Sequence, residues 1–225
     1  MATRSQRIRR LVERSGCGTL IVVPRPSKHP ERKAHLVQIA LKAIQERGIE
    51  GLRVRDVAEM AGVSTATLHY YFDDLDGLWT EVHALAVDKF FTEREAAIAV
   101  LDDAREKMDV MIRGGVPQSA DDPITVALYH IDNAKRVDQL GALLRTRSFD
   151  KQVMLYVGIL ELGVGQGYFT VTDPAIVIAQ NLVGLEDAFC MHIIERNASL
   201  PYQRCTELMF AYARSTTGCR ELGAG

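Results

Sequence analysis

The chain has 225 residues, of which 47% are hydrophobic and 25% charged, a composition typical of an ordinary soluble protein. No apolar run approaches the roughly 18 residues that a membrane-spanning helix needs. The apolar stretch 20–23 is shorter than the core of a signal peptide, so we expect a cytoplasmic protein without a membrane segment. The cysteines lack the C-x-x-C spacing of a zinc site and suggest no disulfide framework: Cys17, Cys190, Cys205 and Cys219.

Charge is unevenly distributed along the chain. Residues 1–72 carry 13 Lys and Arg against 6 Asp and Glu, whereas residues 73–225 carry 14 against 23. A basic first third suggests a polyanionic partner for the N-terminal part alone, although solvated basic faces are common in proteins. Prolines interrupt the end of residues 1–29, and we expect a flexible basic arm there. A start codon assigned too far upstream explains the segment equally well.

The first predicted helix begins at Pro30, because a residue without a backbone N–H is tolerated in a first helical turn. Apolar residues follow at helical spacing, and Gly48 is a suitable residue to end the helix. A second, short helix is expected over 54–61. Ser64 can cap a third helix that ends near Tyr71, because its hydroxyl can accept an otherwise unpaired backbone N–H.

A long fourth helix is expected over 75–101, after a cap at Asp73 or Asp74. Glycines and prolines then separate further helices, which we place at 102–113, 123–146 (whole or broken), 148–167, 174–196 and 201–215. The predicted fold class is therefore all-α. We divide the chain into the arm at 1–29, a three-helix helix-turn-helix domain at 30–76, a larger helical ligand-binding and dimerisation domain at 77–216, and a flexible tail at 217–225.

Residues 53–72, which read RVRDVAEMAGVSTATLHYYF, contain two short helical patterns joined by a turn. This is the layout of a helix-turn-helix, whose second helix enters a major groove about 12 Å wide. A plain helical hairpin would not need such a polar and aromatic second helix, although one of the two tyrosines is alternatively a core residue. The candidate DNA-contacting residues are Arg32, Arg53, Arg55, Ser64, Thr65, Thr67, His69, Tyr70 and Tyr71.

Two segments of this motif, Ala61-Gly62-Val63-Ser64 and Leu68-His69-Tyr70-Tyr71-Phe72, resemble the turn and the recognition helix of the TetR family of repressors. The resemblance is strong over residues 33–80 and continues beyond them only in layout. It implies operator DNA as a partner, a homodimer, and a small-molecule effector bound among the C-terminal helices, with no cofactor. Within the family, residues 182–188 loosely resemble a segment of the choline-responsive repressor group.

Three positions depart from the family's pattern. Arg53 replaces the Ser or Thr that often caps the second helix, and His69 replaces a common Tyr. Leu75 stands where a phosphate-contacting Lys is usual, beside Asp73, Asp74 and Asp76. This acidic patch should weaken non-specific DNA affinity, and we expect Arg32, Arg53, Arg55 and the basic arm to compensate.

Two predicted C-terminal helices, 148–167 and 174–196, carry apolar residues on more than one face. A helix that is apolar on two faces is buried between its own core and something else. We expect these helices to pair with those of a second copy in a four-helix bundle; the alternative is the core of a monomer. A two-fold dimer would also place two recognition helices about one DNA turn apart, roughly 34–36 Å.

The resemblance implies an effector pocket among the C-terminal helices, and ligand binding there would favour a dimer shape that no longer matches the operator. Asn133 and Asp187 are candidates for polar contacts in an otherwise apolar cavity. We expect Asp187 to be buried, and so to face either a cationic ligand or an arginine such as Arg147 of a second copy. The candidate ligand-binding residues are Met108, Met111, Tyr129, Asn133, Phe149, Met154 and Asp187, although ordinary core packing is the more common role for the apolar ones.

Two other classes of function fit less well. The chain has no Walker loop, G-x-S-x-G or H-E-x-x-H pattern, and its glycine-rich residues 163–167 end a helix, so we expect no enzyme and no catalytic residues. The histidines show no metal-ligand spacing, and we expect no metal site. A helix-turn-helix protein that is controlled by a partner, or by no ligand at all, is the alternative.

Overall fold

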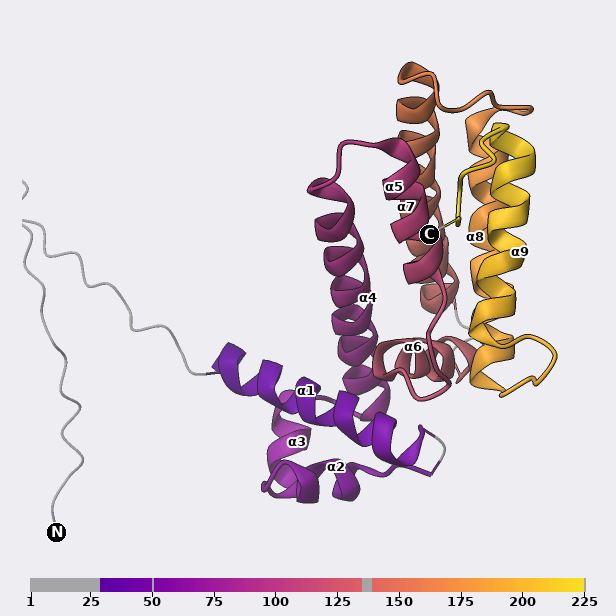
Figure 1. Ribbon diagram of the computed structural model, residues 1–225. Helices are drawn as coiled ribbons and strands as arrows, with labels where there is room; N and C mark the ends of the chain where they lie inside the picture. The colour runs from indigo at the N-terminus through magenta and orange to yellow at the C-terminus, as the bar shows by residue number, and fades with distance from the viewer. Residues whose placement is uncertain (1–28, 50, 135–138, 225) are drawn as a thin grey trace, which may run out of the picture.

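The structure is a computed structural model that describes residues 29–49, 51–134 and 139–224, and within these ranges the chain forms nine α-helices and no strand (Figure 1). The all-α class predicted from the sequence is confirmed. The helices are α1 (His29–Arg47), α2 (Val54–Met60), α3 (Thr65–Tyr71), α4 (Leu75–Ala99), α5 (Ala104–Gly115), α6 (Pro123–Ala134), α7 (Gln139–Gly165), α8 (Ala175–Ile194) and α9 (Tyr202–Thr217).

One hydrophobic core joins α1, α2 and α3 to the first half of α4 and to α6. Leu36 of α1 and Leu68 of α3 are buried in it, together with Trp79 of α4 and Ile131 of α6. The helix-turn-helix unit therefore packs on helices that lie beyond residue 76. The boundary drawn there from the sequence stays a prediction.

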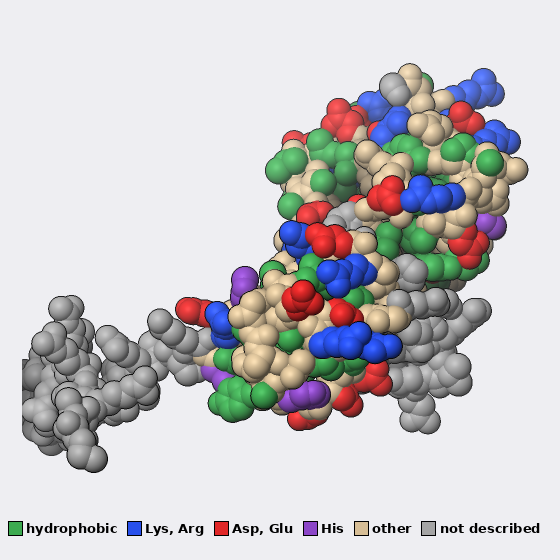
Figure 2. Space-filling model, turned by 90° about the horizontal axis from the view of Figure 1, so that it is seen from below, with side chains coloured by type: hydrophobic (Ala, Val, Ile, Leu, Met, Phe, Trp, Pro, Cys, Tyr) green, Lys and Arg blue, Asp and Glu red, His purple; other side chains and the backbone are tan. Residues whose placement is uncertain are grey.

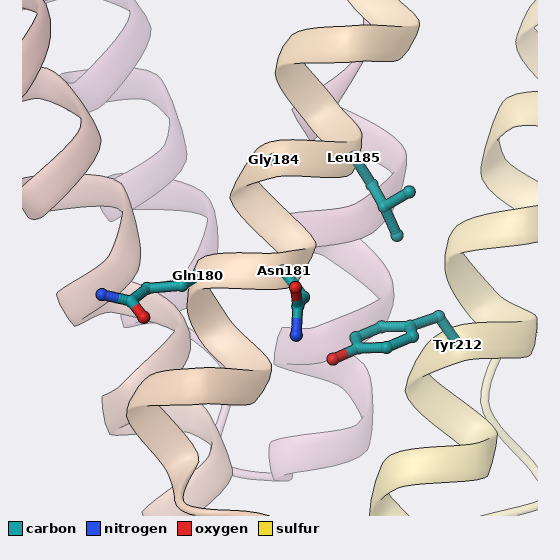
Figure 3. Close-up of a pocket in the computed structure, with 5 residues that line it drawn as sticks. All are labelled: Gln180, Asn181, Gly184, Leu185 and Tyr212. Atoms are coloured by element: carbon teal, nitrogen blue, oxygen red, sulfur yellow. The ribbon is translucent and has the colours of Figure 1, made fainter.

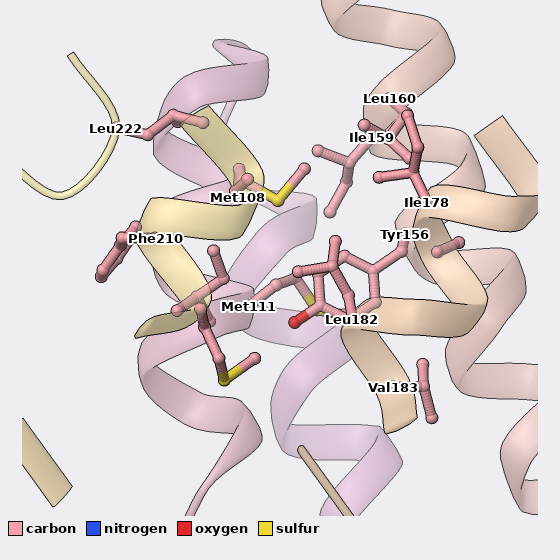
Figure 4. Close-up of a cluster of buried hydrophobic side chains, with 14 of the residues drawn as sticks. Met108, Met111, Tyr156, Ile159, Leu160, Ile178, Leu182, Val183, Phe210 and Leu222 are labelled. Atoms are coloured by element: carbon pink, nitrogen blue, oxygen red, sulfur yellow. The ribbon is translucent and has the colours of Figure 1, made fainter. Parts of the chain in front are cut away.

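A second hydrophobic core lies among α5, α7, α8 and α9, and we call these four helices the sensor body. Side chains from its helices point toward one another in Figure 4, including the fully buried Met108, Tyr156 and Leu182. Helix α4 reaches from one core to the other, because Leu78 belongs to the first cluster and Ile98 packs against the second. Figure 1 shows α4 rising from the helix-turn-helix end toward α5.

Helix α7 differs most from its predicted bounds. It begins at Gln139, whereas the sequence suggested a separate helix from residue 148. No glycine or proline lies between Leu143 and Lys151, so nothing interrupts the helical hydrogen bonding there. The element predicted over 123–146, whole or broken, corresponds to α6 and to the first residues of α7, and residues 135–138 between them lie outside the described residues.

The residues after α9 pack against the sensor body. Gly218 has a positive φ of 67° and ends α9 in the left-handed conformation that favours glycine. Cys219 and Leu222 are buried, and Arg214 donates a hydrogen bond of 2.7 Å to the Leu222 carbonyl. The flexible tail predicted for 217–225 is therefore corrected for 217–224, because two buried side chains anchor this segment to the core.

Among the described helices, α8 is the one whose length and composition would suffice to cross a membrane. The sequence nevertheless contains no uninterrupted apolar run of that length, because Asn181 and Glu186 lie within this helix. Ile178, Leu182 and Phe189 of α8 are buried in the sensor body. Packing in the core therefore accounts for much of the apolar character of α8.

Candidate nucleic-acid interface and sensor core

The start of α3 is held by two side chains that were both predicted to contact DNA. Ser64 is the N-cap, and its Oγ accepts the backbone N–H of Thr67 at 3.1 Å. The Thr67 hydroxyl lies 2.9 Å from the same Oγ, so it also has a partner within the protein. Thr65 is exposed, and no such contact occupies its hydroxyl among the described residues. Thr65 is therefore the threonine of this pair that is better placed to meet a base edge.

Only one of the two hydrogen bonds of a capping box is present at the start of α2. The Asp56 carboxylate accepts the backbone N–H of Arg53 at 2.8 Å, as in half of a capping box. The Arg53 side chain cannot complete the box, because a guanidinium has no acceptor atom. Arg53 and Arg55 are both exposed beside this turn, and Arg32 is exposed on α1. All three predicted arginines thus reach solvent, where phosphates would be accessible.

An aromatic group covers the end of α3. Tyr70 is 72% exposed, whereas Tyr71 is half-buried. The His29 ring, at the start of α1, lies 5.5 Å from the Tyr70 ring and 4.6 Å from the Tyr71 ring, measured between centroids. The sequence reasoning missed His29, because only the fold brings the start of α1 to the end of α3. His69 is exposed on the same helix.

The helix-turn-helix end carries charges of both signs. Figure 2, which views this end, shows basic and acidic side chains interspersed. Of the 13 basic residues in 1–72, seven precede His29 and lie outside the described residues, as do residues 1–28 of the predicted flexible arm, whose last residue begins α1. Asp74 has a structural role, since its carboxylate caps α4 by accepting the Gly77 N–H at 2.8 Å. One member of the acidic patch at the start of α4 therefore serves as the N-cap of that helix.

The structure does not bring the predicted ligand residues together. Met108 and Met111 are buried in the sensor body, and Phe149 packs against its edge. Met154 is 59% exposed on α7, and the Tyr129 hydroxyl donates to Glu195 at 3.0 Å in an exposed pair. The side chain of Asn133 lies outside the described residues. Their role in ligand binding stays a prediction.

The buried carboxylate in this region belongs to Glu186 and not to Asp187. Glu186 is 1% exposed, whereas the Asp187 side chain reaches solvent, which corrects the expectation that Asp187 is buried. Surrounding protein, together with the negative charges of Glu186 and Asp132, nevertheless raises the pKa of Asp187 to about 6. Because neighbouring helical residues point about 100° apart, only one of two adjacent acids can face the core.

Glu186 accepts hydrogen bonds from three side chains. Arg94 of α4 donates two of them, from Nη2 to Oε1 at 2.9 Å and from Nη1 to Oε2 at 3.1 Å. On α7, Gln152 donates to Oε2 at 3.0 Å and the Tyr156 hydroxyl to Oε1 at 2.5 Å. The sequence held a signal for this site, since Glu186 follows the buried Leu182 by one helical turn.

Burial and the charge of neighbouring groups together shift the pKa values of Arg94 and Tyr156. Burial by itself would lower the pKa of Arg94, but the adjacent Glu186 carboxylate outweighs it and raises that pKa further above its ordinary value. Burial, and then the charge of Glu186, raises the pKa of Tyr156. Arg94 therefore stays cationic and Tyr156 neutral at any physiological pH, so a cation and a hydroxyl both donate to the Glu186 carboxylate.

A shallow pocket of about 350 Å³ opens between α8 and α9. In Figure 3 the Tyr212 side chain of α9 lies across from Asn181 and Leu185 of α8. Gln180 and Gly184 complete the lining. Open and partly apolar, this pocket forms part of a surface rather than an enclosed cavity.

The chain is similar in sequence to known regulators. Residues 36–82 match the family model for bacterial regulatory proteins of the tetR family. The HTH-type transcriptional repressor KstR2 of Mycolicibacterium smegmatis is 27% identical over 146 residues, which cover 64% of this chain and 70% of that protein. The HTH-type transcriptional regulator BetI of Rhizobium meliloti is 28% identical over 142 residues, which cover 62% of this chain and 70% of that protein.

Solved structures share the fold along most of the chain. A transcriptional regulator from Saccharomonospora viridis, crystallised in complex with choline, has a TM-score of 0.74 at 18% identity and covers 82% of this chain and 96% of its own. A TetR transcription regulator from Haloarcula marismortui has a TM-score of 0.73 at 18% identity, with coverage of 84% and 99%. Residues 36–82, which include the helix-turn-helix of α2 and α3, therefore belong to the DNA-binding region of the tetR family of bacterial regulatory proteins, and the helices that follow share the fold of the solved regulators.

Proposed function

We propose that this chain is a cytoplasmic repressor that binds a palindromic operator as a homodimer and leaves it when a small molecule binds among the C-terminal helices. The observation that supports DNA reading most directly is the exposure of Thr65, His69 and Tyr70 along α3. Polar and aromatic side chains on an exposed short helix suit a major groove, where base edges are distinguishable. Exposed Arg53 and Arg55 beside them suit the phosphate backbone.

Operator binding is tested with duplexes that tile the promoter region of the chain's own gene and its neighbours. Fluorescence anisotropy should find one duplex bound at least about 1,000-fold more tightly than the rest. Thr65→Ala should weaken that complex by about 5- to 100-fold, because a base-edge contact is lost. Thr92→Ala, at an exposed position of α4, is the matched control. Equal affinity for every duplex would reject specific operator binding.

Exposed apolar side chains support the dimer. Met154 and Leu162 lie two turns apart on α7, and Val177 and Met191 lie four turns apart on α8, at spacings that keep each pair on one helix face. Between the two residues on α8 lies Gly184, which also lines the pocket between α8 and α9. A second copy is the occupant we propose, because a two-fold partner covers this surface and also supplies the second α3 that a palindrome needs.

The dimer is tested by light scattering coupled to size-exclusion chromatography. The wild-type chain should have twice its own mass of 25.0 kDa. Nothing lies within 4 Å of a Cβ atom built on Gly184, so Gly184→Glu fits on the single chain but places a charge in the proposed contact. That variant should be monomeric, whereas Gly114→Glu, at an equally open position of α5, should not. A wild-type mass of 25.0 kDa at every concentration would reject the dimer.

Effector binding is tested by thermal shift and by release of the operator. Choline is the first probe, because the similar regulator from Saccharomonospora viridis was crystallised with it. An effector should raise the melting temperature and weaken operator binding, and operator should weaken effector binding by the same factor. A compound that binds equally well with and without operator is not a releasing effector. If choline gives no thermal shift, a screen of metabolites replaces it.

A ligand-independent regulator is the second candidate. The packing of Met108 and Met111 within the core favours it, since these residues were expected to line an effector cavity. Sequence-specific DNA binding, combined with no thermal shift across a broad metabolite screen, would support this candidate over the first. An effector that releases the operator would exclude it.

A further inference from the structure

Helix α4 links the DNA-binding end to the sensor body. Its contacts at each end therefore determine the orientation of the DNA-binding end relative to the sensor body. Leu78 and Val82 of its first half belong to the core that α1, α2, α3 and α6 share. Its second half contacts the sensor body through Ile98 and through the buried Arg94. Apolar contacts tolerate sliding and small rotations better than a pair of directional hydrogen bonds does. The polar contact at Arg94 therefore restricts the position of α4 more than the apolar contact at Ile98 does.

The Arg94 guanidinium and the Glu186 carboxylate form a two-pronged ion pair between α4 and α8. Their side chains are 6% and 1% exposed, and each carboxylate oxygen accepts from a different guanidinium nitrogen. Arg94 Nη2 also donates to the Met111 carbonyl of α5 at 3.2 Å, and the guanidinium lies 4.8 Å from the centre of the Phe90 ring. A planar guanidinium held in this way permits one orientation of α4 relative to α5 and α8.

Glu186 is itself held in place from other helices. Gln152 and Tyr156 of α7 donate to its two oxygens, and Gly115 of α5 leaves the space that the carboxylate fills. Four helices thus meet at one side chain. Among the residues that the structure describes, Arg94 Nε nevertheless has no hydrogen-bond partner, which is a stability cost that an apolar core would avoid. Replacing a buried ion pair by apolar residues is often neutral or stabilising, so a requirement for stability alone does not explain this one.

We propose that the Arg94–Glu186 ion pair is a positioning element that fixes α4 on the sensor body and thereby sets the orientation of the helix-turn-helix. Its consequence for operator affinity rests on the proposed function, whereas the claim about domain orientation does not. A regulator whose recognition helices must match half-sites at a fixed spacing has a use for such a constraint. A signal that moves α8 or α7 would reach α4 through this carboxylate.

The test separates positioning from mere stability by removing the ion pair in two ways. Glu186→Gln keeps the shape and removes the charge, while the double variant Arg94→Met with Glu186→Leu replaces the pair by apolar side chains. Glu95→Gln is the matched control, because the exposed ion pair of Glu95 and Lys151 at 2.8 Å also joins α4 to α7. Melting temperatures are measured first, so that every later comparison is between folded proteins.

Domain orientation is read from distances between two spin labels in the full chain. Labels are introduced through an unnatural amino acid at the exposed positions Glu59 of α2 and Gln203 of α9, so the native cysteines stay unchanged. Labelled chains are diluted with unlabelled ones, which isolates the distance within one chain. We expect one narrow distribution for the wild-type chain and for Glu95→Gln. We expect a broader or displaced one for Glu186→Gln and for the double variant.

Operator affinity is the second readout. The double variant should bind the operator about 3- to 30-fold more weakly than the wild type, even at an equal melting temperature, and Glu95→Gln should not. A folded double variant with wild-type distances would overturn the proposal. If the double variant does not fold, the distances between the spin labels in Glu186→Gln test the proposal instead. A wild-type chain that binds no duplex would reject the proposed function, while the distances would still decide the positioning role.

Discussion

A Cβ atom built on Gly115 would lie 1.9 Å from Oε1 of Glu186 and 2.4 Å from its Cδ. No side chain tolerates such a contact, so the absence of a side chain at Gly115 is what admits the buried carboxylate beside Arg94. Gly115 is the last residue of α5, and its φ is not positive. The glycine is therefore required here by close packing and not by the turn that follows.

Gly115→Ala should displace Glu186 from its hydrogen bonds and lower the free energy of unfolding by about 2–4 kcal/mol. Urea unfolding followed by circular dichroism, at one fixed protein concentration, measures it. Gly114→Ala is the matched control, because a Cβ there has nothing within 4 Å. The control should change stability by less than about 1 kcal/mol. Equal urea midpoints for Gly115→Ala and the wild type would mean that Glu186 does not occupy this space.

Arg53→Ser should stabilise the protein and weaken its DNA binding at the same time. Serine supplies the side-chain acceptor that Arg53 lacks at the N-cap of α2, which is worth about 0.5–1 kcal/mol. Loss of an exposed positive charge next to the helix-turn-helix should reduce operator affinity and flatten its dependence on salt concentration. Arg220→Ser, at an exposed position after α9, should do neither. A variant that gains stability without losing affinity would remove Arg53 from the DNA-contacting set.

The two tyrosines of α3 should behave differently. Tyr70 is 72% exposed, so Tyr70→Ala should change the free energy of unfolding by less than about 0.5 kcal/mol while weakening the operator complex. Tyr71 packs against the first core, so Tyr71→Ala should cost about 1–2 kcal/mol of stability. Thermal melts and anisotropy on the same samples measure both quantities. Unchanged operator affinity in Tyr70→Ala would show that its exposure serves no DNA contact.

Asp187 should make stability depend on pH between about 4 and 6. Its pKa is raised to about 6 in the folded protein, above its usual value of about 3.9, so the folded state binds more protons than the unfolded state in this window. The stability gained by protonation is present near pH 4 and is lost as the pH rises through 6.

Asp187→Asn should therefore raise the melting temperature at neutral pH and leave it unchanged near pH 4. Because the side chain reaches solvent, we expect a gain of only about 1–3 °C. Melting curves of both proteins across the range measure the difference. A constant gap between the two proteins at every pH would contradict a titration of Asp187.

Much of the DNA-binding unit could be predicted from the sequence because its determinants are local. A cap at Ser64, a turn at Gly62 and the helix ends near Tyr71 and Gly48 depend on residues within a few positions of one another. The sensor body was harder to predict. The start of α7 and the anchoring of Leu222 depend on contacts with helices far away in the sequence.

The sequence by itself determined that the chain is helical, where most helices begin and end, and that α3 carries exposed side chains suited to a DNA groove. Only the tertiary structure decided that Glu186 and not Asp187 is buried, that His29 meets Tyr70 and Tyr71, and that α6 joins the first core. The reason is physical. Helical periodicity predicts which face of a helix is apolar, but it does not decide which of two adjacent residues at the edge of that face is buried. The packing of neighbouring helices decides this.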